Sequence, residues 1–128
     1  MSEQRNKFYN AIREKYPVIS EKADAEYMEL WGECNDLEYD THSWFEALAN
    51  VLNKQMSLSV PAERFKDLFL DISIAFKSDN EDVRKCIDVA FVENLYWQVT
   101  PEKAESYWNI MPETLQELYV NFHHRTPV

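Results

Sequence analysis

Glycine is nearly absent from this chain: its 128 residues include one, Gly32. Phosphate-binding loops need several glycines so that the backbone can approach the anion, and neither GxGxxG nor GxxxxGK[ST] occurs. The GxSxG turn that presents a nucleophilic serine is excluded on the same ground. Scarce glycine also disfavours an all-β protein with many tight turns. The sequence therefore argues against several common classes of nucleotide-binding and hydrolytic enzyme.

Cysteine is scarce as well. Cys34 and Cys86 are the only two, and neither belongs to a CxxC motif or a Cys/His cluster. Such spacing favours two reduced thiols over a disulfide or half of a metal site, and we expect Cys86 to lie in the core.

Long apolar runs are missing too, so we expect no transmembrane helix. The N-terminal segment MSEQRNKFYN is polar and lacks the apolar region of a secretory signal. We therefore expect a cytoplasmic protein. Hydrophobic residues still make up 45% of the chain and aromatic residues 14%, which is ample for a packed core. At this length a single domain spanning residues 1–128 is expected.

The apolar residues that are present recur at helical spacing, with no persuasive strand alternation. Pro17 should end the first helix, Ser20 should cap the second, and Asp40 or Thr41 should cap the third. The residues expected to face the core of these three helices are Phe8, Ile12 and Tyr16; Ala23, Tyr27, Leu30 and Trp31; and Trp44, Phe45, Leu48, Val51 and Leu52.

Four more helices are expected in the rest of the chain. Pro61 should open the fourth, Asn80 should cap the fifth, Thr100 with Pro101 should open the sixth, and Pro112 the seventh. The segment CIDVAFVENLYW is apolar around most of its circumference, so the fifth helix should be the central, most buried one. The sequence predicts an all-α, single-domain bundle of six or seven helices.

Catalytic and metal-binding patterns are weak. His42 and Glu46 share a helix face, but two ligands do not make a metal site, and His123 and His124 belong to no HExxH motif. Glu93, inside the apolar run, could be a tuned catalytic acid or a structural residue that reaches solvent. The neighbouring Asn94 could tie helices together by hydrogen bonds. We expect no catalytic residue, no metal and no cofactor.

Charge is concentrated in one region. Residues 21–46 hold nine carboxylates and one cation, Lys22, giving a net charge of −8 out of −10 for the chain. Lys22 could offset Glu26 one helical turn later, but no cation is placed to offset the carboxylates that follow. Such a stretch can be a solvated face that aids solubility, or a docking surface for a cationic partner.

A docking surface would exclude some partners. Nucleic acid and anionic membranes both require basic patches, so we expect neither. A basic protein is the partner class that remains, and nucleases are basic because they attract phosphates. Interfaces often set aromatic anchors inside a charged rim, and Tyr39, expected in an exposed loop, is the best candidate. The predicted partner-binding residues are Glu29, Glu33, Asp36, Glu38, Tyr39 and Asp40.

The C-terminal segment AFVENLYWQVTPEKAESYWNIMPETLQELYVNFHH, residues 90–124, adds a resemblance. Together with the acidic, cysteine-poor, helical character of the chain, it is similar to small immunity proteins of bacterial toxin systems, including contact-dependent growth inhibition. The residues that carry the likeness are Phe91, Glu93, Asn94, Leu95, Trp108, Met111, Pro112 and Leu118. The resemblance implies an antitoxin that binds a cognate toxin domain tightly and covers its active site or a nearby surface.

Two other classes stay open. A helical interaction adaptor with no toxin would bind through apolar grooves and show little sensitivity to salt. An enzyme or metal-dependent hydrolase would use carboxylates together with His42. The oligomeric state is not indicated by the sequence.

Overall fold

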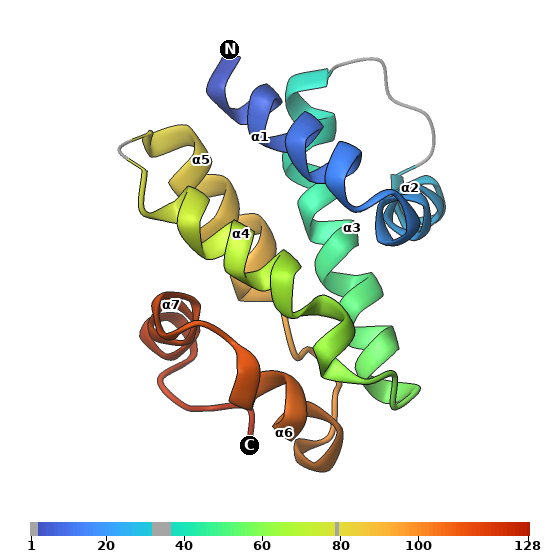
Figure 1. Ribbon diagram of the computed structural model, residues 1–128, viewed down its shortest axis with the longest axis vertical. Coiled ribbons are helices and arrows are strands. Elements are labelled where there is room, and N and C mark those ends of the chain that lie inside the picture. The colour runs from blue at the N-terminus through green and yellow to red at the C-terminus, as the bar shows by residue number, and fades with distance from the viewer. Residues whose placement is uncertain (1–2, 32–36, 79) are drawn as a thin grey trace.

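The computed structural model describes residues 3–31, 37–78 and 80–128, with the backbone alone described for residues 31 and 37–40. The described residues form seven α-helices and no strand, so the all-α prediction is confirmed. The first three helices are α1 (Glu3–Lys15), α2 (Pro17–Trp31) and α3 (Leu37–Ser57). In Figure 1, α1 lies at the end of the molecule opposite α6 (Pro101–Ile110) and α7 (Glu113–His123).

Between α3 and α6, α-helices alternate with 3-10 and π-helical turns. The 3-10 turn η1 (Ala62–Phe65) leads into α4 (Lys66–Phe76), and α5 (Glu81–Lys85) continues as the π-helical turn η2 (Cys86–Phe91) and the 3-10 turn η3 (Val92–Asn94). No helix in the described ranges is long and apolar enough to cross a bilayer.

The start of α2 differs from the expectation. Ser20 does not cap this helix, because its N–H already donates to the Tyr16 carbonyl, 3.0 Å away, and the helix begins at Pro17. Proline suits a first helical position, since it has no N–H that would remain unpaired there. Ser20 therefore lies inside the helix and is 3% exposed. Leu30, expected to face the core, is 47% exposed.

The start of α3 also differs. The helix begins at Leu37, so neither Asp40 nor Thr41 caps it, and Tyr39 lies in a helix instead of a loop. Thr41 is fully buried, and its hydroxyl donates to Asn6 Oδ1 of α1 at 3.3 Å. The Thr41 hydroxyl therefore makes a tertiary hydrogen bond to α1 and does not cap α3. The expected core stripe of this helix is confirmed, with Trp44, Phe45, Leu48, Val51 and Leu52 all buried.

The fifth helix is central but irregular. Asn80 caps it as predicted, with Oδ1 accepting from the Val83 N–H at 3.0 Å. Ile87, Ala90, Phe91 and Val92 are fully buried, which confirms the expected burial. The regular α-helix nevertheless ends at Lys85, and the helical turns end at Asn94, three residues before the end of the CIDVAFVENLYW segment.

The proline positions were predicted more closely. Pro101 is the first residue of α6, and Pro112 stands directly before α7. Thr100 occupies the cap position of α6 but makes no side-chain capping bond. After Pro61, the 3-10 turn η1 precedes α4 where the sequence predicted one continuous helix.

One hydrophobic cluster joins these elements. Cys86 is a free thiol within it, as expected, and burial raises the pKa of that thiol to about 12. Cys34 lies outside the described residues.

Candidate partner-binding groove

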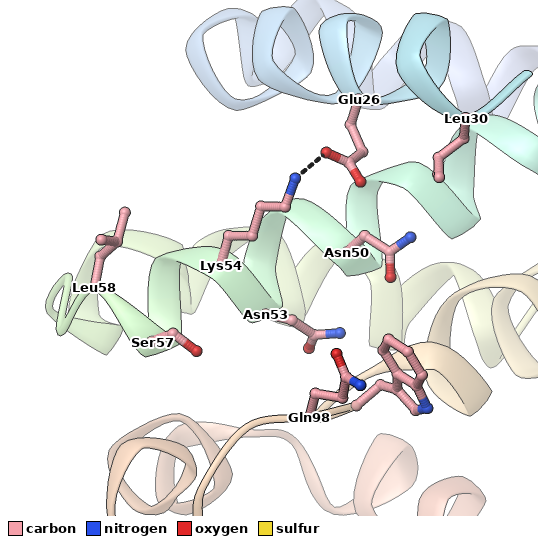
Figure 2. A pocket seen from close by; sticks show the side chains of 9 residues that line it. Glu26, Leu30, Asn50, Asn53, Lys54, Ser57, Leu58 and Gln98 are labelled. Atoms are coloured by element: carbon pink, nitrogen blue, oxygen red, sulfur yellow. Dashed lines mark hydrogen bonds and ion pairs between the residues drawn. The ribbon is translucent and has the colours of Figure 1, made fainter.

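A groove of about 530 Å³ lies where α2 and α3 meet the turn that follows η3. Figure 2 shows Glu26 and Leu30 extending from α2 toward Lys54 and Asn50 of α3, with Gln98 on the opposite wall. We call this the α2–α3 groove; its lining residues are Glu26, Leu30, Asn50, Asn53, Lys54, Ser57, Leu58, Trp97 and Gln98.

Three large apolar side chains of this groove are open to solvent. Leu30 is 47% exposed, Trp97 65% and Leu58 72%. They come from α2, the turn directly after α3 and the turn after η3, so the fold gathers apolar surface from three segments. Single exposed apolar residues are ordinary, whereas a group of them lining one groove is typical of an interaction site.

The turn that presents Trp97 has unusual backbone geometry. Tyr96 and Gln98, the residues on either side, have φ values of 67° and 56°. Neither is glycine, and each such left-handed residue costs on the order of 1–3 kcal/mol. Other interactions of the fold must offset this cost for the turn to persist.

The buried side chain of Tyr96 fixes the turn to the core. Its ring is buried and meets Trp108 and Tyr119 edge to face, and its hydroxyl lies 2.9 Å from Met111 Sδ. Its N–H donates to Asn53 Oδ1 at 2.6 Å. The left-handed conformation is thus fixed by packing and by a side chain of α3.

Asn53 also holds the segment just before the turn. Its Nδ2 donates to the Asn94 carbonyl at 2.8 Å, and Asn53 is 6% exposed. The sequence offered Asn94 as the residue that ties helices together. Its side chain instead donates to the Ala90 carbonyl, 2.7 Å away in its own segment. The tie between elements is made by Asn53, which the sequence did not single out.

The charge of Glu26 is compensated from another helix, and not by Lys22 one turn earlier as the sequence predicted. Glu26 is 8% exposed and pairs with Lys54 of α3, with 2.5 Å between Oε1 and Nζ. This hydrogen bond raises the pKa of Lys54, and the charge of the exposed Glu29 adds to the effect. The expected offset of Glu26 by Lys22 is therefore wrong, because a cation from another helix takes that place.

A second carboxylate of the acidic stretch is compensated in the same way. Asp24 forms an ion pair with Arg13 of α1, whose Nη2 lies 3.0 Å from Oδ2, and it accepts a hydrogen bond from Trp44 Nε1 at 2.8 Å. The bond to Asp24 raises the pKa of Arg13. Part of the acidic stretch thus stabilises the fold, and Glu29 is the described carboxylate beside the groove that faces solvent.

The predicted partner-binding residues are only partly placed. Glu29 is exposed in the last two turns of α2, and the backbone of Glu38, Tyr39 and Asp40 forms the first turns of α3. Glu33 and Asp36, and the side chains of residues 38–40, lie outside the described part. The sequence analysis did not single out Trp97, because no motif or apolar periodicity marks the turn that exposes it.

His42 and Glu46, the pair considered for a metal site, are not joined by a third ligand in the described ranges. Burial, together with the charges of Arg5 and Lys85, lowers the pKa of His42, and burial raises that of Glu46. No three His, Cys, Asp or Glu residues in the described ranges are grouped closely enough to hold a metal ion.

The end of the fifth helix is tied to α7 by a histidine. Burial and the charge of Asp88 raise the pKa of Glu93, whose carbonyl accepts from His123 Nε2 at 3.2 Å. His123 packs against Tyr119 with ring centroids 4.2 Å apart. His123 therefore ties α7 to the end of the fifth helix, a role that no sequence motif indicated.

Comparison with known proteins adds a family. No curated protein and no solved structure matches the chain. One family model, described as Domain of unknown function (DUF7674), matches residues 9–125. That range contains all the lining residues of the α2–α3 groove, the whole of α2 to α7 and the second half of α1. The chain therefore belongs to the DUF7674 family.

Proposed function

We propose that this protein is an immunity protein that binds a basic partner protein through the α2–α3 groove and the acidic residues beside it, and so neutralises a toxin. The observation that carries the proposal is Trp97, which is 65% exposed on a turn with two left-handed, non-glycine residues. A fold that maintains strain to display an aromatic ring beside an apolar groove has the features of a binding surface.

Trp97 is the expected anchor of the interface. Tryptophan is among the residues whose truncation costs most at protein interfaces, and such residues lie in pockets near the centre of the contact. Leu30 and Leu58 provide apolar surface next to it. Asn53 fixes the turn in advance, so binding would not have to order it.

The expected partner is basic. The chain carries a net charge of −10, and −8 of it lies in residues 21–46, which include the groove residues Glu26 and Leu30. A field of one sign speeds the encounter with an oppositely charged partner and disfavours partners of the same sign. The resemblance of residues 90–124 to immunity proteins points to a toxin domain, and a nuclease is the toxin class whose basic surface fits best. The role is inhibitory binding without catalysis.

A helical adaptor with no toxin is the second candidate. The groove favours it, since the exposed part of the lining is largely apolar and Glu26 is already paired with Lys54. The two candidates differ in salt dependence. Steered binding to a basic domain weakens as salt rises, whereas binding dominated by apolar contacts changes little.

The test is capture of the partner from an extract of the source cell, or from the product of the neighbouring gene, followed by titration calorimetry with the purified pair. Trp97→Ala should raise Kd by roughly 30-fold or more, which is the effect of losing an interface anchor. Leu70→Ala is the matched control, because Leu70 is 49% exposed on α4 and lies outside the groove.

A charge variant tests the acidic residues. It carries Glu29→Gln, Glu33→Gln, Asp36→Asn, Glu38→Gln and Asp40→Asn. The control removes five exposed carboxylates elsewhere, so that both variants change the net charge equally: Glu63, Glu102, Glu105, Glu113 and Glu117, each to Gln. The proposal requires that the first variant weakens binding more than the second, that salt weakens wild-type binding, and that the captured protein is a toxin inhibited in the complex.

The outcomes separate the candidates. Loss of binding with Trp97→Ala, with equal effects of the two charge variants and no salt dependence, supports the adaptor. If neither Trp97→Ala nor the charge variant affects binding, the α2–α3 groove is not the interface and both candidates fail in this form.

A further inference from the structure

A second groove lies at the opposite end of α2 from the first. Its volume is about 270 Å³, and it is bounded by the α1–α2 junction, the first turns of α2, one residue of α3 and the turn η1. We call it the α2 N-terminal groove; its lining residues are Lys15, Tyr16, Pro17, Val18, Ile19, Lys22, Gln55, Arg64 and Phe65.

The charge of this groove is opposite to that of the molecule. Three of its nine lining residues are cations and none is a carboxylate, although the chain has 23 acidic residues against 13 lysines and arginines. Lys22 and Arg64 are exposed and form no ion pair with any residue in the described ranges. The fold has brought them together from α2 and η1.

The third cation is already engaged. Lys15 Nζ lies 2.7 Å from Asp71 Oδ2, and the hydrogen bond to Asp71 raises the pKa of Lys15, with the charge of Asp67 adding to it. The Tyr16 hydroxyl donates to the same carboxylate. This network holds the α1–α2 junction against α4, while Lys22 and Arg64 keep their charge available to a ligand.

The remaining lining is mostly apolar. Val18 is 74% exposed, while Ile19 and Phe65 are each 6% exposed. The groove thus combines an apolar wall with two uncompensated cations. A ligand that matches both needs an apolar body and one anionic end.

We infer that the α2 N-terminal groove binds a small amphiphilic carboxylate, with the carboxylate between Lys22 and Arg64 and the aliphatic chain along Val18 and Phe65. Guanidinium groups pair with carboxylates in a two-pronged geometry, which lysine complements as a point charge. The volume is just below the roughly 300–1,000 Å³ of pockets for drug-sized ligands, so a short-chain molecule fits better than a helix of a partner. A nucleic acid is disfavoured because the net charge of −10 would repel its phosphates. The inference is independent of the proposed toxin partner.

The test uses three probes on the whole chain: octanoate, octanol and acetate. Octanol keeps the chain without the charge, and acetate keeps the charge without the chain. Octanoate should bind with a Kd at least tenfold lower than either, measured by calorimetry or by the rise in melting temperature with ligand concentration.

Variants locate the site. Lys22→Gln with Arg64→Gln should weaken octanoate binding roughly tenfold or more, since both charge-assisted contacts are lost. Lys77→Gln with Lys85→Gln is the control. This double variant removes the same charge, and the two lysines are exposed and lie outside the groove. Val18→Thr replaces a methyl group by a hydroxyl and keeps the side-chain shape. It should weaken the binding of octanoate but leave the binding of acetate unchanged. None of these residues forms an ion pair in the described ranges, so folding should be retained.

The inference is overturned if octanol binds as tightly as octanoate, because the cations would then contribute nothing. Equal effects of the two charge variants would also overturn it, since they would show attraction by net charge alone. Binding of octanoate that resists Val18→Thr and the Lys22/Arg64 double change would place the ligand elsewhere.

Discussion

The two ends of helix α2 present contrasting surfaces. At its start, the α2 N-terminal groove sets Lys22 and Arg64 beside an aliphatic wall. Toward its end, the α2–α3 groove sets Glu26 beside an exposed tryptophan. Both grooves use α2 and α3, yet we propose ligands of opposite charge for them: a basic protein at the α2–α3 groove and a small carboxylate at the α2 N-terminal groove.

The difference teaches that the charge of a segment is not the charge of a surface. Residues 21–46 carry −8 by sequence, but two of their carboxylates, Asp24 and Glu26, are paired with Arg13 and Lys54 from other helices. The cations of the α2 N-terminal groove likewise come from three different elements. Four measurements test this contrast between the two grooves.

The largest effect should come from ionising two buried groups of the hydrophobic core, Cys86 and Tyr107. Burial raises the pKa of Cys86 from 9.0 to about 12 and that of Tyr107 from 10.0 to about 12. A folded-state pKa above the unfolded one gives stability that is complete below about pH 9 and is lost as pH rises toward about 12. The free energy of unfolding should fall by on the order of 3 kcal/mol from Cys86 alone between about pH 8 and about pH 11.5.

Urea unfolding at the two pH values measures this effect. Cys86→Ala is the comparison, because it removes the thiol and should show a shallower loss on going to high pH. An identical loss in the variant and the wild type would show that Cys86 does not contribute to the alkaline instability.

Asn53→Ala should act on one groove alone. It leaves the Tyr96 N–H and the Asn94 carbonyl without their acceptor and donor, and unsatisfied buried groups cost about 1–3 kcal/mol each. We expect a loss of about 2–4 kcal/mol in the free energy of unfolding, together with altered fluorescence of Trp97. Asn50→Ala, in the same groove, should change stability by less than about 0.5 kcal/mol. Equal effects would mean that Asn53 does not hold the turn.

Lys54→Met tests the compensated charge of the α2–α3 groove. It keeps the aliphatic length but leaves Glu26, which is 8% exposed, without its cation. Because Lys54 itself is 60% exposed, we expect a loss of about 1–2 kcal/mol, below that of a fully buried pair. The control Lys22→Met removes an exposed cation and should be nearly neutral. If both lysines behave alike in urea unfolding, Glu26 does not depend on Lys54.

The smallest effect should come from Asp71, which supports the edge of the cationic groove. Hydrogen bonds from Lys15 and then Tyr16 lower the pKa of Asp71 below 3.8. A depressed folded-state pKa gives stability that is present above the unfolded value and is lost as pH falls through the folded one. Asp71→Asn should cost about 0.5–1 kcal/mol near neutral pH, because the pair is largely accessible to solvent.

Melting curves followed by circular dichroism check this sign. The difference between wild type and Asp71→Asn should be constant from about pH 7 to about pH 4.5 and shrink by about pH 2.5. A difference that grows on acidification would contradict the arrangement seen at the α1–α2 junction.

Structural features that depend on contacts within one helical turn were predicted well from the sequence. Asn80 caps its helix as expected, because its amide oxygen reaches an N–H three residues away whatever the rest of the fold does. Ser20 and Thr41 looked equally good but were wrong. The first lies in a helix that Pro17 had already opened, and the hydroxyl of the second bonds Asn6 across a helix interface.

The candidate site could be predicted only in part. Glu29 is exposed, as the docking hypothesis requires, because carboxylates are rarely buried unless they are paired. Trp97 could not be found from sequence, because nothing in the local pattern signals that Tyr96 and Gln98 adopt positive φ values. That conformation is maintained by Asn53, 43 residues before Tyr96, and by buried aromatic rings.

The helical class, the helix starts marked by Pro101 and Pro112, most of the core stripes and the acidic balance follow from the sequence, because helix propensity, capping and apolar periodicity act over a few residues. Tertiary structure alone decided where the charges and grooves lie. Arg13 meets Asp24 across 11 residues of chain and Lys54 meets Glu26 across 28, and such pairs exist only once helices pack. Packing brings together side chains that are distant in sequence, so the surface on which a partner or ligand would act is a property of the fold.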